Sequence, residues 1–152
     1  MTPHPQNHDP VTPQVKAIFF ICCMGLLAFY GTLHSPFHYD DTHAIVKNPY
    51  IKDLSKFQEK VGIQNVFNRS ALLFSYAVNQ NLGKMEVFGY HLVNILIHIL
   101  NAILCFFLVT KFLCIEAFKY RSQLKILPLV CSVIHLVNPL NVQAVTYISS
   151  RS

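Results

Sequence analysis

The chain has 152 residues, of which 53% are hydrophobic and 12% are charged. Water-soluble domains carry about twice that share of charged residues, so the composition excludes an ordinary soluble domain and indicates a protein partly surrounded by lipid. The net charge of +5 does not indicate nucleic-acid binding, because the basic residues are scattered and form no stripe with stacking aromatic residues.

The cysteines and histidines show no pattern typical of disulfide frameworks or zinc sites. All five cysteines lie in or beside apolar runs, and the long polar segment 34–90 contains none. The sequence has no Cys-x-x-Cys pair and no Cys/His cluster with zinc spacing, and its eight histidines are dispersed. We therefore expect neither a disulfide-stabilised domain nor a structural metal site.

The first apolar run follows a proline-rich start. Residues 1–14 hold four prolines among polar residues and are expected to form a flexible tail. The uncharged run from Ala17 to Leu33 then predicts a retained transmembrane helix over 15–33, at the short end of spanning length. A secretory signal would have a shorter core, a more basic start and a small-residue cleavage site, which Thr32 to Ser35 match poorly.

Residues 34–90 lack an uninterrupted apolar run of spanning length, and we predict a structured, partly helical extracytoplasmic loop here. Ser55 and Gln58 have capping-box spacing ahead of a short helix. Apolar residues at helical spacing predict a second helix over 71–82, with Gly83 at its end. Two interpretations of that helix stay open: it lies in the membrane interface, or it is a core helix beneath other loops.

The second transmembrane helix is predicted over 91–113, and it carries a polar stripe. Four polar residues recur along it at intervals of three, four and three: His91, Asn94, His98 and Asn101. They share one helix face, which should meet protein or water and not lipid. Such stripes join helices more often than they perform chemistry.

Positive charge is concentrated around the connector 114–125. The bases in and beside it are Lys111, Lys119, Arg121 and Lys125. Because basic loops remain on the cytoplasmic side, we predict that this connector and the amino terminus are cytoplasmic and that 34–90 is outside or lumenal.

The third transmembrane helix is predicted over 126–148, with a kink near Pro139, where a backbone hydrogen bond is lost. Residues 149–152 follow without a polar tail, which favours a truncated architecture over a complete small protein. The predicted fold is an all-α, multi-pass integral membrane protein with three transmembrane helices.

Two adjacent carboxylates, Asp40 and Asp41, lie where the chain should leave the bilayer after the first span. Carboxylates at a membrane boundary stay ionised only if water, a cation or a basic partner compensates them, so the pair is a candidate reaction centre. A solvated loop start with a turn-forming aspartate is the alternative interpretation.

Several ordered stretches carry a resemblance to a known family. They are Phe37–Asp41, Ala44–Pro49, Arg69, Ser75–Gly83, Phe88–Asn94 with His98, and Asn138–Val145. In this order they resemble the amino-terminal part of the multispanning glycosyltransferases of the GT-C type, in the branch that carries tetratricopeptide repeats and is similar to the O-mannosyltransferases. Members continue through further membrane helices into a repeat domain, so the resemblance implies that this chain is part of such an enzyme and inactive alone.

The chain departs from the family pattern at three places. Ser70 and Asn138 stand where the family often has proline and histidine, and Gln143 occupies a frequently acidic position. The loss of a proline relaxes a helix start, and asparagine in place of histidine removes a titratable group. These departures bear on activity more than on the fold.

The resemblance implies transfer of a sugar, with mannose as a candidate, from a polyprenyl-phosphate donor to a protein or glycan hydroxyl, in a bacterial inner membrane or the endoplasmic reticulum. Asp40 and Asp41 would be catalytic, one as general base and the other orienting it or holding a divalent cation. Arg69 would meet the donor phosphate and His91 would line the groove, against the alternatives of an exposed arginine and a packing histidine. A small three-span structural, accessory or remnant membrane protein is the competing interpretation of the whole chain.

Overall fold

The structure, a computed structural model, describes residues 11–37, 41, 45–47, 70–84, 86–114 and 124–150. This part of the chain is helical and contains no strand. Its elements in chain order are α1 (Val11–Phe29), η1 (Tyr30–His34), α5 (Ser70–Gly83), α6 (Val87–Leu113), α7 (Leu127–Val137), η4 (Pro139–Asn141), α8 (Val142–Thr146) and η5 (Ile148–Ser150).

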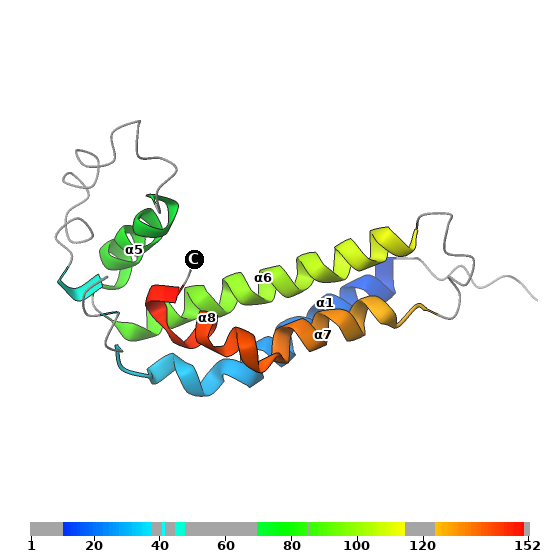
Figure 1. The fold of residues 1–152 in the computed structure, drawn as a ribbon, viewed down its shortest axis with the longest axis horizontal. Helices are drawn as coiled ribbons and strands as arrows, with labels where there is room; N and C mark the ends of the chain where they lie inside the picture. Colours follow the sequence, from blue (N-terminus) through cyan, green and yellow to red (C-terminus); the bar gives the residue numbers. More distant parts are fainter. Residues whose placement is uncertain are drawn as a thin grey trace, which may run out of the picture.

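Two helices of the described chain are long and apolar enough to cross a membrane. One runs over Pro13–His34, where η1 continues α1, and the other is α6. A third candidate is broken, because α7 and the segment Pro139–Thr146 meet at a bend of 49°. Helices α1, α6 and α7 lie alongside one another as an elongated bundle (Figure 1). The described residues thus contain two segments of spanning type, or three if the bent pair counts as one.

Helix α1 begins at Val11, inside the stretch that the sequence assigns to a flexible tail. Pro13 is compatible with this start, since the first N–H groups of a helix have no intrahelical partner to lose. At its other end the helix tightens into η1 and stops before Pro36, and the Ser35 amide donates to the Thr32 carbonyl at 3.0 Å. Pro13 is thus tolerated in the first turn, and Pro36 accounts for the end of this segment.

The bend predicted near Pro139 is present. Polar side chains form hydrogen bonds with the backbone carbonyls that lose their helical partners at this bend. Pro139 has no N–H to offer the His135 carbonyl, and Asn141 Nδ2 donates to that oxygen at 2.9 Å. His98 Nε2 lies 3.0 Å from the Leu136 carbonyl and can donate to it. Because an unpaired carbonyl is costly where no water is present, these contacts stabilise the bend.

The bundle core lies between α1, α6 and α7 and extends to α8. Its buried residues are Ile21, Phe29, Leu33, Ile95, Ile99, Ala102, Phe106, Leu136 and Val145. Gly25 allows α1 and α6 to approach closely, because a Cβ atom there would lie 2.5 Å from Ile99 Cγ1. Ser132 Oγ also donates to the Ala102 carbonyl at 2.6 Å. Small residues and interhelical hydrogen bonds are the usual means by which helices pack in lipid.

The polar stripe of α6 faces protein along most of its length. His91, Asn94 and His98 are buried, whereas Asn101 is exposed, so for Asn101 contact with water or further protein stays a prediction. With 3.6 residues per turn, Asn101 lies roughly 80° around the helix from His91 and falls at the edge of the contact face. The stripe therefore joins helices through three of its four members.

The helix predicted over 71–82 is present as α5, with Gly83 as its last residue. Its position in the membrane interface stays a prediction. The helix expected near Ser55 and Gln58 lies outside the described residues. All five cysteines lie among the described residues, and no disulfide joins any two of them.

Candidate functional site at the α5 end of the bundle

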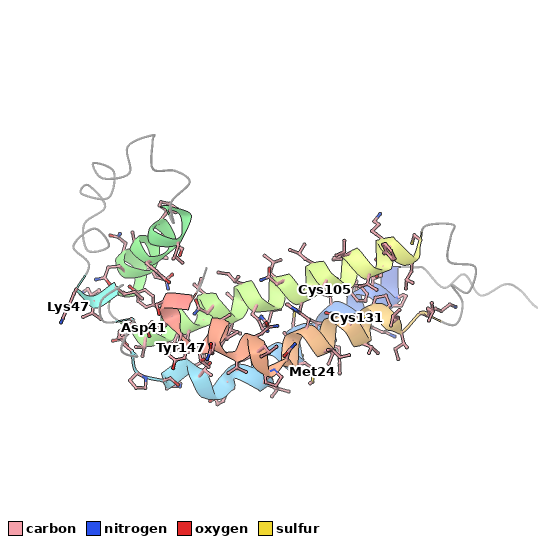
Figure 2. All side chains as sticks on the ribbon, viewed as in Figure 1. Met24, Asp41, Lys47, Cys105, Cys131 and Tyr147 are labelled. Atoms are coloured by element: carbon pink, nitrogen blue, oxygen red, sulfur yellow. The ribbon has the colours of Figure 1, made fainter. Side chains whose placement is uncertain are left out.

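One end of the bundle brings α5, η1, the first turns of α6, α8 and η5 together (Figure 1), and we call it the α5 end. A second buried apolar cluster lies here, formed by Ile45, Tyr76, Tyr90 and Ile148 with Phe37 and Leu72 packed against it. Figure 2 shows Asp41 and Tyr147 at this end, away from Cys105 and Cys131. The α5 end therefore contains Asp41, one of the site residues predicted from the sequence.

Asp41 is completely buried at the α5 end. Its Oδ1 atom accepts a hydrogen bond from the backbone N–H of Ser149 at 2.7 Å. Ser149 lies in η5, whose leading N–H groups have no partner within so short a helix. The carboxylate thus has a polar partner on the backbone of the carboxy-terminal segment, and it is not the solvated turn residue of the alternative interpretation.

Two tyrosines hold neighbouring parts of the same region. The hydroxyl of Tyr76, on α5, donates to the Ile148 carbonyl at 2.6 Å. The hydroxyl of Tyr90, on α6, donates to Gln80 Oε1 at 3.0 Å. The two rings lie 6.4 Å apart by their centroids, so they also tie α5 to α6 by direct contact.

Asn94 continues this pattern from α6. Its Nδ2 atom donates to the carbonyls of Val145 and Tyr147, at 3.3 and 3.4 Å. These oxygens belong to the end of α8, where helix carbonyls lack intrahelical partners. Together with Asp41 and Tyr76, Asn94 therefore fixes the backbone of residues 145–149 against α5 and α6.

His91 is completely buried and has one satisfied ring nitrogen. Its Nε2 atom lies 3.0 Å from the Ser35 carbonyl. Because a carbonyl oxygen can only accept, Nε2 carries a proton in this contact, and in the neutral imidazole Nδ1 is then an acceptor. Nδ1 is buried and has no hydrogen-bond partner among the described residues. A donor such as a hydroxyl group would satisfy it.

The structure brings two of the four sequence-predicted site residues to the same end of the bundle. Asp41 and His91 each contact a different backbone group there, Ser149 and Ser35, and no hydrogen bond between them is seen. Asp40 and Arg69 lie outside the described residues. Within the described chain, no group of three or more potential ligands is placed to hold a metal ion.

Tyr76 and Ser149 are the participants that sequence reasoning missed. Tyr76 lies inside one of the stretches that carry the family resemblance, but its partner Ile148 is 72 residues away. Asp41 and Ser149 are separated by 108 residues. No helical or turn spacing links positions so far apart, so only the tertiary arrangement reveals these contacts.

In comparisons with known proteins, no family model, no curated protein and no solved structure matches this chain.

Proposed function

We propose that this chain forms the amino-terminal membrane part of a GT-C type glycosyltransferase, which transfers a sugar such as mannose from a polyprenyl-phosphate donor to a protein or glycan hydroxyl. The observation that carries the proposal is the buried Asp41 carboxylate at one end of a bundle of membrane-type helices. A buried carboxylate is costly unless it is compensated, so its presence there calls for a reason. The ordered family-like stretches supply the reaction class.

In the proposed reaction, a carboxylate of the Asp40–Asp41 pair takes the proton of the acceptor hydroxyl. The acceptor oxygen then attacks the anomeric carbon of the donor sugar, and the bond from that carbon to the phosphate oxygen breaks. The leaving polyprenyl phosphate keeps the electron pair, with Arg69 as the proposed partner of its charge. The bond between Asp41 Oδ1 and the Ser149 amide supports a fixed orientation of the carboxylate, which general-base catalysis requires.

The contacts of His91 favour a sugar-binding role over a phosphate-binding one. With its Nε2 proton directed to the Ser35 carbonyl, a neutral His91 offers only the Nδ1 lone pair. A lone pair repels a phosphate oxygen but accepts a hydrogen bond from a sugar hydroxyl. We therefore assign His91 to the sugar of the donor and leave the phosphate to Arg69.

A non-catalytic membrane protein is the second candidate, and a specific observation favours it. Asp41, Tyr76 and Asn94 all bind the backbone of residues 145–149, so each has a structural role that requires no substrate. Under this interpretation the Asp41 carboxylate only caps a backbone N–H of η5, from a position far away in the sequence, and the α5 end binds no sugar donor.

Photolabelling of the chain in membranes distinguishes the two candidates. We expect a diazirine-bearing polyprenyl-phosphate mannose to label the α5 end saturably, and unlabelled donor, but not the uncharged polyprenol, to compete. His91→Leu should weaken the labelling, whereas Asn101→Leu, on the exposed side of the same helix, should not. Labelling that polyprenol displaces equally well, or that does not saturate, would contradict the glycosyltransferase proposal.

The rate of sugar transfer tests the proposed role of Asp41 as a general base. Asparagine retains an oxygen that can accept from the Ser149 amide but loses the basic carboxylate, so Asp41→Asn separates anchoring from base catalysis. In the complete enzyme that this proposal implies, we expect a loss of transfer of about 100-fold or more with donor labelling retained. Unchanged transfer would remove Asp41 from the catalytic assignment.

A further inference from the structure

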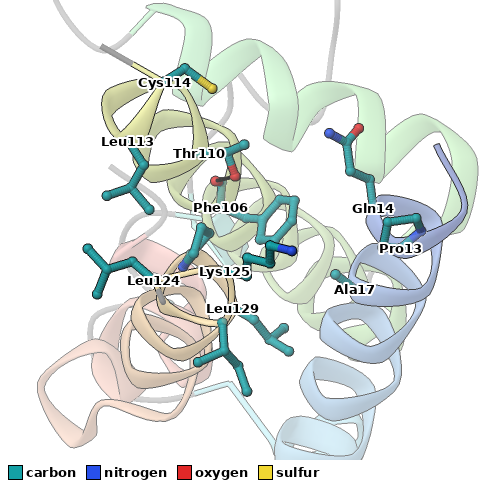
Figure 3. Close-up of a pocket in the computed structure, with 12 residues that line it drawn as sticks. Pro13, Gln14, Ala17, Phe106, Thr110, Leu113, Cys114, Leu124, Lys125 and Leu129 are labelled. Carbon is teal, nitrogen blue, oxygen red and sulfur yellow. Dashed lines mark hydrogen bonds between the residues drawn. The ribbon is translucent and has the colours of Figure 1, made fainter. Parts of the chain in front are cut away.

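The opposite end of the bundle holds a cavity of about 460 Å³ between the start of α1, the end of α6 and the start of α7 (Figure 3). Its volume lies within the range of pockets that bind small ligands. Apolar side chains from all three helices line it, among them Ala17, Phe106, Leu113 and Leu129. The interior is therefore suited to a hydrocarbon group.

The polar groups of this cavity are few, and one of them is cationic. Lys125 and Gln14 line it together with Thr110, whose hydroxyl is already bonded to the Phe106 carbonyl at 2.7 Å. The Lys125 ammonium and the Gln14 amide are the side-chain nitrogen donors of this lining. An ammonium group beside apolar walls suits a ligand that has an anionic group at one end and hydrocarbon at the other.

The charge distribution around the cavity also favours an anion. The exposed lysines Lys16, Lys111 and Lys125 belong to the helix ends that surround it, and we call this region the basic end. The carboxylates of the described residues are Asp41 and Glu86, and both lie at the other end of the bundle. An anion at the basic end therefore meets no opposing carboxylate from the described chain.

The position of the cavity along the helices selects the class of ligand. It lies at the ends of α1 and α6, the two segments of spanning type, where headgroups meet acyl chains in a bilayer. Basic pockets between membrane helices at this depth commonly hold lipid headgroups. We propose that the cavity binds one anionic phospholipid, with an acyl chain against Phe106 and Leu129 and the phosphate at Lys125. This site is separate from the proposed sugar-transfer site and does not depend on it.

Lipid retention measured by native mass spectrometry tests the proposal. The full chain, purified in detergent, is exposed to an equimolar mixture of phosphatidylserine and phosphatidylcholine. We expect a single phosphatidylserine to be retained preferentially. Lys125→Gln should lower that preference about fivefold, the effect of one lysine near a membrane surface. Lys47→Gln, an exposed lysine at the α5 end, is the matched control and should change nothing.

A second variant tests the cavity independently of charge. Ala17→Phe places a ring in the cavity and should abolish retention of the lipid while Lys125 remains. Equal retention of both lipids by the unaltered chain, or unchanged retention in Ala17→Phe, would overturn the proposal. Displacement of the lipid by millimolar inorganic phosphate would also overturn it, because the site would then bind a free anion without using its apolar walls.

Discussion

The carboxylate of Asp41 accepts a hydrogen bond from the Ser149 amide at 2.7 Å, although the two residues are 108 positions apart. This contact joins the segment that follows α1 and η1 to the segment that follows α8, beyond the bend at Pro139. Tyr76 and Asn94 hold the carbonyls of the same segment, so donors and acceptors on both sides fix its backbone. The α5 end is consequently a tertiary structure whose polar contacts can be tested one at a time.

Asp41→Ala should destabilise the protein, because it leaves the buried Ser149 amide without its partner. A buried group deprived of its hydrogen bond costs about 1–3 kcal/mol. Asp41→Asn retains an acceptor oxygen and should cost less. The free energy of unfolding in mild detergent, measured for both variants, checks this order, and an alanine variant as stable as the unaltered chain would show that the contact contributes nothing.

Tyr76→Phe should interact energetically with Asp41→Ala. Tyr76 and Asp41 bond to the backbone of adjacent residues, Ile148 and Ser149. The loss of one bond should loosen this backbone and thereby weaken the other bond. We expect a coupling of about 0.5–3 kcal/mol between the two substitutions in a double-mutant cycle of unfolding free energies. Strict additivity would mean that the carboxy-terminal segment is not held as a unit.

Gly25→Ala should destabilise the bundle, since the new methyl group would lie 2.5 Å from Ile99 Cγ1 and 2.9 Å from Ile99 Cδ1. Overpacking of this kind costs about 1–3 kcal/mol. Gly31→Ala is the matched control, because a Cβ there meets no atom within 4 Å. Thermal unfolding in detergent compares the two variants. If Ile99→Ala fails to relieve the effect of Gly25→Ala, the close contact is not its cause.

His98→Leu should destabilise the packing of α6 against α7. His98 is placed to donate to the Leu136 carbonyl just before the bend at Pro139, and leucine cannot replace that bond. Hydrogen bonds between membrane helices are worth about 0.6–1.7 kcal/mol, which sets the expected loss. Asn101→Leu, at an exposed position of the same helix, should be neutral in the same unfolding assay. Equal effects of the two substitutions would argue against an interhelical role for His98.

The local features of this fold follow from sequence patterns, and its long-range contacts do not. The apolar runs identify the membrane-type helices, Pro139 identifies the bend, and Gly83 identifies the end of α5, because each acts through hydrophobicity or the backbone of its own segment. Spacing also predicts that His98 faces protein, but not that it meets the Leu136 carbonyl. That partner depends on how two helices align.

In the candidate site, too, local features could be predicted from the sequence and long-range contacts could not. An acidic residue after the first span draws attention to Asp41, but its burial and its Ser149 partner depend on the placement of a segment 108 residues later. His91 is predicted to face away from lipid, yet the ring nitrogen that binds Ser35 follows only from the geometry. Helical spacing fixes the face of a residue, whereas its chemical role depends on the groups opposite it.

The orientation of the chain in a membrane is the measurement that tests the central claim most directly. Sugar transfer from an extracytoplasmic polyprenyl phosphate requires the α5 end to face away from the cytosol, and the basic end to face the cytosol. In a background without the native cysteines, Lys84→Cys marks the α5 end and native Cys114, restored alone, marks the basic end; both positions are exposed. We predict that a membrane-impermeant maleimide added to intact cells, or to sealed endoplasmic-reticulum vesicles opened selectively, labels position 84 from the extracytoplasmic side only and Cys114 from the cytosolic side only. Labelling of position 84 from the cytosol would contradict the account.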